Sequence, residues 1–206
     1  MAGSGYQLRT YSFLDQLQPQ LASYVAKDNR AFDPSEYDAA MYIEIAPAMD
    51  IHVMIDLALK NTRVRLGVVI TERQFGQLEI HHADQGEVLA AGKAILDATG
   101  LSEGDRTPCK MLTDKVLRGI EGDHAIALTN LGPGNQVLSG ESILIMECEP
   151  AAYMAFICNE ALKAAHTRLN LVTTWGATGR LILSGDEANI DAAAAAARSA
   201  AHTLKK

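Results

Sequence analysis

The chain has 206 residues, a length that allows one medium-sized domain or two small domains of about 100 residues each. Its hydrophobic fraction of 48% with only 5% aromatic residues is typical of a globular protein whose core is filled by Ala, Val, Ile and Leu. The formal net charge of −7 argues against non-specific binding to nucleic acid or to an anionic membrane surface, since either would need a concentrated basic patch.

The first half of the chain predicts two strands, a helix that starts at a proline, a hairpin and a closing helix. These elements are expected, in chain order, at residues 7–14, 42–45, 47–59, 66–71 with 77–80, and 85–98. Pro47 suits the first turn of its helix. Apolar residues at helical spacing predict the buried face of that helix: Ile51, Met54, Ile55, Ala58 and Leu59.

The second half predicts the same elements in the same order. They are expected at residues 110–117, 143–146, 150–162, 169–174 with 180–183, and 187–204. Asp186 is a plausible N-cap for the closing alanine-rich helix. Between the halves, residues 99–109 are rich in turn formers, so we expect domains at residues 1–98 and 110–206 joined by this linker.

A shift of 103 residues aligns the two halves. Residues 44–80 then match residues 147–183 without a gap, with twelve identities in thirty-seven positions, where roughly two or three would arise by chance. The chain is therefore a tandem duplication, and its predicted fold class is α+β, two sandwiches each made of a sheet with helices packed on one face. Small domains with few aromatic residues bury little apolar area alone, so a symmetric oligomer is expected.

The sequence lacks the patterns of the common catalytic and cofactor sites. It contains no G-x-S-x-G, P-loop, G-x-G-x-x-G or H-E-x-x-H motif, so no catalytic residue and no cofactor is predicted. His81, His82 and Asp84 resemble a metal site, but neighbouring strand residues point to opposite faces, so no metal is predicted. The absence of a long apolar run, of a secretory signal and of paired cysteines predicts a cytoplasmic protein.

Several segments together resemble the bacterial microcompartment shell domain. In the repeats these are Ala58–Lys60 and Ala161–Lys163, each followed by a strand, a loop and a closing helix. More specific segments are similar to the tandem-domain, circularly permuted subclass, to which gated carboxysome shell trimers belong. They are Leu8–Tyr24, Glu44–Pro47, Thr71–Gly76 and Asp84–Gly92. The resemblance runs from about residue 7 to residue 202, nearly the whole chain.

This resemblance implies a trimer that forms a pseudohexagonal tile of a polyhedral shell, often as two stacked trimers, with a central pore for small metabolites. An adjacent Glu-Arg pair in the first pore loop opens or closes the pore in this subclass, which corresponds to Glu72 and Arg73. The other implied pore-loop residues are Thr71, Gln74, Phe75, Thr174, Trp175 and Gly176. Lys60 and Lys163 would lie at the tile edge. The implied partners are further copies of the chain and the hexamers and pentamers of the shell.

Each of these roles has a simpler alternative in the residues themselves. Glu72 and Arg73 would also suit a solvated turn, and a lysine at a helix C-terminus such as Lys60 is favoured by the helix dipole alone. Trp175 could line the pore or cap the core at a strand end. For the whole chain, the alternatives are a soluble small-molecule-binding regulatory protein of paired α+β domains and, less favoured, an enzyme with its site between subunits. Shell formation would separate the first interpretation from ligand-dependent binding to a partner.

Overall fold

The computed structural model describes residues 5–28 and 31–205, which fold into two compact units within Met1–Pro108 and Cys109–Lys205. The first unit contains β1 (Gln7–Leu14), α1 (Pro19–Asp28), β2 (Ala39–Ala46), the 3-10 turn η1 (Ala48–Asp50), α2 (Ile51–Asn61), β3 (Arg65–Glu72), β4 (Phe75–His82), α3 (Gln85–Thr99) and the 3-10 turn η2 (Glu103–Asp105). The second contains β5 (Lys110–Leu117), α4 (Gly122–Thr129), β6 (Ser142–Glu149), α5 (Tyr153–Ala164), β7 (Arg168–Thr173), β8 (Gly179–Gly185) and α6 (Glu187–Thr203). The α+β fold class is confirmed.

The duplication extends over every strand of the chain. Each unit has one antiparallel four-stranded sheet, with the orders β1-β2-β4-β3 and β5-β6-β8-β7. A shift of 103 residues places the bounds of β1 on those of β5, and the bounds of β2 on those of β6. Even the irregularities repeat, because the register shifts between Leu8 and Thr10 in β1 and between Met111 and Thr113 in β5.

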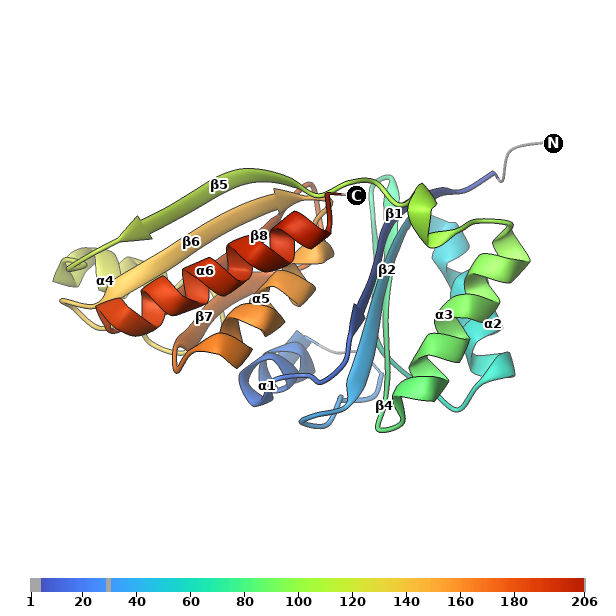
Figure 1. Cartoon of the computed structure of the whole chain (residues 1–206), viewed down its shortest axis with the longest axis horizontal. Coiled ribbons are helices and arrows are strands. Elements are labelled where there is room, and N and C mark those ends of the chain that lie inside the picture. Colours follow the sequence, from blue (N-terminus) through green and yellow to red (C-terminus); the bar gives the residue numbers. More distant parts are fainter. Residues whose placement is uncertain (1–4, 29–30, 206) are drawn as a thin grey trace. The chain divides into compact units, whose positions relative to one another are not determined.

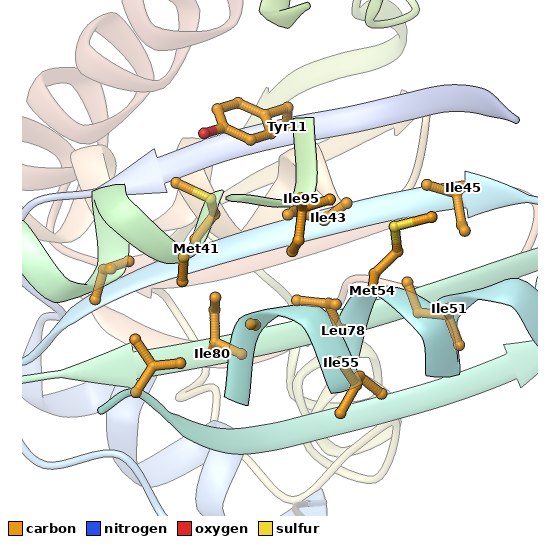
Figure 2. Packing of buried hydrophobic residues seen from close by; sticks show 14 of the residues in the cluster. Tyr11, Met41, Ile43, Ile45, Ile51, Met54, Ile55, Leu78, Ile80 and Ile95 are labelled. Atoms are coloured by element: carbon orange, nitrogen blue, oxygen red, sulfur yellow. The ribbon is translucent and has the colours of Figure 1, made fainter. Parts of the chain in front are cut away.

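In each unit a pair of helices covers one face of the sheet, α2 with α3 in the first and α5 with α6 in the second (Figure 1). Alternate residues of β2 (Met41, Ile43 and Ile45) point to this side, as the period of a strand requires. They meet Ile51, Met54 and Ile55 of α2 and Ile95 of α3 (Figure 2). The buried face predicted for α2 is thus largely right, but Leu59 is wrong, because 43% of it is exposed.

Two helices were not expected from the sequence, α1 and α4. They occupy equivalent places along the chain, because each follows the first strand of its unit and precedes the second. In the first unit α1 lies on the side of the sheet away from α2 and α3 (Figure 1). In the second, Ala125 and Leu128 of α4 pack with Ile143 and Ile182 of the sheet. Pro19 at the first position of α1 was the available sequence signal, whereas α4 is only eight residues long. The prediction of helices on one face only is therefore wrong.

The prolines that were expected in the first helical turn instead precede it. Pro47 caps η1, and α2 begins four residues later, at Ile51. Pro150 likewise precedes a turn, and α5 begins at Tyr153. In both units this lead-in packs closely on the sheet, because a Cβ on Gly76 or Gly179 would overlap a carbonyl oxygen of the lead-in. The Asp186 cap is confirmed, since its carboxylate accepts the Asn189 N–H.

A glycine in the middle of α3 makes room for a tyrosine from β1. A Cβ on Gly92 would overlap the Tyr11 hydroxyl and the Met41 sulfur. Tyr11 is 8% exposed, and its burial, followed by the charge of Glu103, raises the pKa of its phenol to about 12. The neutral phenol is therefore favoured by the fold.

This burial predicts a loss of stability at high pH. An unfolded tyrosine ionises near pH 10, so the folded state holds more protons than the unfolded state between about pH 10 and pH 12. The contribution of Tyr11 is present below pH 10 and is lost as the pH rises through this window. Urea unfolding at pH 9 and at pH 11.5 should show a larger loss for the wild type than for Tyr11→Phe. Equal losses in the two proteins would contradict this assignment.

Candidate functional site

The β3–β4 turn carries the predicted gate residues. Glu72 and Phe75 form the last pair of the two strands, so only Arg73 and Gln74 make the turn. The side chains of Thr71, Arg73 and Gln74 are exposed, and those of Glu72 and Phe75 are half-buried. The short connection thus presents one acidic and one basic side chain at the tip of a regular hairpin.

The backbone of Arg73 is in a conformation that favours glycine. Its φ is +52°, and among the described residues only Tyr37 is a second non-glycine with a positive φ. The position equivalent to Arg73 in the second unit is Gly176, whose φ is +92°. Glycine adopts this region without the steric cost that a Cβ brings. The first turn therefore retains an arginine at a local conformational cost, a pattern found at functional positions.

Glu72 and Arg73 have no hydrogen-bond or ion-pair partner among the described residues. The Oε2 atom of Glu72 is buried and accepts no hydrogen bond from the described residues. Arg73 forms no ion pair or hydrogen bond with any residue of the described ranges 5–28 and 31–205. A buried carboxylate oxygen without a donor is unfavourable. The exposed Arg73 side chain is therefore available for a partner outside the chain, and Glu72 has a buried carboxylate oxygen that still lacks a donor.

The equivalent turn of the second unit, residues 174–178, contains no ionisable side chain. Thr174 is buried, Trp175 is 44% exposed, and Gly176 supplies the positive φ. Trp175 is thus partly exposed at this turn. The two turns thus share a positive φ at equivalent positions but differ in length and in chemistry, since the first carries ionisable side chains and the second an aromatic one.

The two predicted edge lysines lie in equivalent last turns of α2 and α5. Lys60 pairs with Asp56 at 2.7 Å, and Lys163 pairs with Glu160 at 2.7 Å. The Lys60 side chain is largely exposed, whereas that of Lys163 is one-quarter exposed. Both lysines lie on helix ends, whereas the predicted pore residues lie on hairpin turns.

The histidine pair does not form a metal site. His81 is buried and contacts Glu79 through Nδ1 at 3.1 Å, whereas His82 accepts the Asp84 N–H, so the two rings diverge as expected. Within the described ranges, no group of three or more His, Cys, Asp or Glu side chains is placed to hold a metal ion. In the same part of the chain, no helix is both long and apolar enough to cross a membrane.

Two residues that support the turns were missed by the sequence analysis. Glu44 and Glu147 occupy equivalent positions in β2 and β6. Glu44 pairs with Arg9, which contacts the Phe75 ring at the first turn, and Glu147 accepts a hydrogen bond from Thr178 at the second turn. The repeat alignment contained a signal for these two residues, because Glu44 and Glu147 form one of its identical pairs. Their part in holding the turns requires the side-chain geometry, which the alignment does not give.

Solved structures place this fold among the permuted, tandem-domain shell proteins of bacterial microcompartments. One neighbour is "the fused permuted hexameric shell protein MSM0275 from the RMM microcompartment". It is 39% identical, with a TM-score of 0.95 over 97% of this chain and 98% of that one. A second is the "double ringed trimeric shell protein MSM0271" from the same microcompartment. It is 34% identical, with a TM-score of 0.93 over 97% and 98% of the two chains.

Sequence relatives narrow this class. Residues 8–105 match the family model of the CsoS1D N-terminal domain. The chain is 45% identical to the carboxysome shell protein CsoS1D of Hydrogenovibrio crunogenus, over 96% of this chain and 97% of the relative. It is 41% identical to the carboxysome shell protein CcmP of Synechococcus elongatus, over 97% and 94% of the two chains. The chain belongs to this CsoS1D/CcmP family of shell proteins, which confirms the predicted role as a structural tile of a microcompartment shell and the location in that shell.

Proposed function

We propose that three copies of the chain form a pseudohexagonal tile whose central pore is lined by the β3–β4 and β7–β8 turns, with Glu72 and Arg73 as its gate. The observation that carries the proposal is this pair of ionisable side chains, which have no partner among the described residues and are held on a turn that glycine would suit better. Around a three-fold axis, three such pairs bring like charges together. Each arginine is then stable either against a carboxylate of a neighbouring copy or turned away into solvent, which gives two gate states.

Exposed apolar side chains support assembly through both units. Large hydrophobic residues are exposed on η1 and α2 and, in the second unit, on β5, α4 and the loops that follow α4. They are Met49, Val53, Leu59, Leu112, Leu117, Ile126, Leu131 and Leu138. Clusters of this kind mark interaction surfaces when they are contiguous. In the proposed trimer, each of the two units of a chain would supply one of six similar sectors of the tile.

The partners follow from the same role. We infer contacts with other shell hexamers and pentamers, with Lys60 and Lys163 at the tile edge, and passage of small metabolites through the pore. The charge and radius of a pore decide which solutes cross it. The proposed tile needs no cofactor and has no catalytic role, since its named relatives are structural shell proteins.

The first test is the mass of the purified protein by light scattering at several concentrations. With a chain of 22.1 kDa, a trimer would have a mass of about 66 kDa and two stacked trimers about 133 kDa. Electron microscopy of the same sample should then show sheets or closed tiles. A concentration-independent monomer or dimer would remove the three-fold axis and with it the pore.

The gate itself is tested by replacing both charged residues. Glu72→Ala with Arg73→Ala should leave the oligomer mass unchanged, since neither side chain has a partner among the described residues. It should also eliminate the closed state of the pore in cryo-electron microscopy maps. Gln74→Ala, on the same exposed turn, is the matched control and should keep both gate states. A double variant that still shows a sealed pore would refute the assignment of the gate.

A further inference from the structure

An arginine from the edge strand β1 reaches the base of the first pore turn. Arg9 Nε donates to Glu44 Oε1 of β2 at 2.7 Å, and the guanidinium carbon lies 3.6 Å from the centre of the Phe75 ring. Strands β1 and β4 are not neighbours, because β2 lies between them. The Arg9 side chain therefore spans β2 and links the edge strand to the first residue of β4.

A β-bulge directs this side chain. The register of β1 against β2 shifts between Leu8 and Thr10, which makes Arg9 the extra residue of the bulged strand. Bulges re-aim a side chain relative to the regular alternation of a strand. Arg9 is only 6% exposed, so the ion pair and the stacking contact are both shielded from water. Planar stacking on an aromatic ring is a property of arginine that lysine does not share.

Phe75 transmits this contact to the gate. It pairs directly with Glu72, and the two turn residues between them are Arg73 and Gln74. The residue that closes one end of the turn is thus the residue whose ring contacts Arg9. A desolvated cation–π contact is strong enough to change the ratio of two states by about tenfold.

The second turn is held in a different way. The residue equivalent to Arg9 is Leu112, which is exposed, and the residue equivalent to Phe75 is Thr178. The Thr178 hydroxyl donates directly to Glu147 Oε1 at 2.6 Å, and Arg180 Nε lies 3.5 Å from the same oxygen. A glutamate at the same position thus supports both turns, directly in the second unit and through Arg9 in the first. A ring contact, that of Arg9 with Phe75, supports the first turn.

We propose that Arg9 is a positioning residue for the gate, which sets the balance of its open and closed states through its stacking on Phe75. This inference rests on the proposed pore function, since it assumes that Glu72 and Arg73 line a pore. It assigns a role to a residue that lies outside the pore turns. Variants of Phe75 and a lysine at position 9 can change the Arg9–Phe75 contact while a positive charge stays beside Glu44.

The test compares Phe75→Leu with Phe75→Tyr in the assembled, full-length protein. Leucine removes the ring and leaves the Arg9–Glu44 pair, whereas tyrosine keeps the ring. Cryo-electron microscopy of each purified assembly gives the ratio of particles with open and closed gates, and light scattering gives the mass. Phe75→Leu should shift the gate ratio at least about fivefold at unchanged mass, and Phe75→Tyr should keep the wild-type ratio. A leucine variant with the wild-type ratio would overturn the proposal.

Arg9→Lys is the second, independent variant. Lysine retains a charge beside Glu44 but lacks the planar face, so the gate ratio should shift in the same direction as with Phe75→Leu. A change in melting temperature without a change in gate ratio would assign Arg9 a purely structural role and would refute the inference. The cryo-electron microscopy map of the wild type distinguishes a failure of this inference from a failure of the proposed pore function. If Glu72 and Arg73 lie away from any pore there, the pore function itself is wrong.

Discussion

Replacing Gly179 with alanine is expected to lower the free energy of unfolding by about 3 kcal/mol or more. Gly179 begins β8, and an added Cβ would overlap the carbonyl oxygen of Ala151 and press on the Met154 side chain. The obstructing atom belongs to the backbone, so the α5 lead-in has to move away from the sheet. Urea unfolding followed by circular dichroism, at one protein concentration, measures the loss. The equivalent Gly76→Ala should cost a similar amount, because Ala48 stands in the same place.

Gly122→Ala is the matched control for this prediction. Gly122 lies at the start of α4, and the nearest atom to an added Cβ is the Ser139 hydroxyl oxygen at 3.9 Å. Alanine favours a helix over glycine by up to about 1 kcal/mol, so this variant should be neutral or slightly more stable. If Gly179→Ala and Gly122→Ala had equal stability, the close packing of the α5 lead-in on the sheet would be wrong.

Leu78→Ala should be the second most damaging change, with a loss of about 2–5 kcal/mol in the free energy of unfolding. Leu78 is fully buried in the central strand β4 and packs with the residues of α2 and β2 shown in Figure 2. Truncation removes its apolar contacts and leaves a cavity that a sheet covered by two helices cannot readily close. Chemical unfolding of purified variants gives the size of the effect.

The control for this cavity is a change of shape at constant volume. Leu78→Met should cost less than about 1.5 kcal/mol, because methionine refills most of the space. Leu181 occupies the equivalent position in β8 and is also fully buried, so Leu181→Ala should resemble Leu78→Ala. A loss below 1 kcal/mol at Leu78 would show that the first core is far looser than the structure describes.

The sequence determined most of the architecture because both units repeat the same local patterns. Alternating strands, the apolar face of α2 and the Asp186 cap are short-range features, and each repeat supports the assignment made in the other. The 103-residue period identified a duplication, and the structure carries it through β1 and β5, where the two sequences share little. The predictions of pore and edge residues came from family resemblance, which no short-range pattern replaces.

Only the tertiary structure decided how the β3–β4 and β7–β8 turns are held. The pairing of Arg9 with Glu44 joins residues 35 positions apart, and the Arg9–Phe75 contact crosses an intervening strand. A bulge and the order of strands bring these groups together, and neither can be read from composition or periodicity. The helices α1 and α4 were missed for a related reason, since they are short and depend on packing against the sheet for their stability. The sequence alone thus determined the repeat and its elements, whereas long-range packing decided the exposure of Leu59 and Trp175 and the support of the β3–β4 turn.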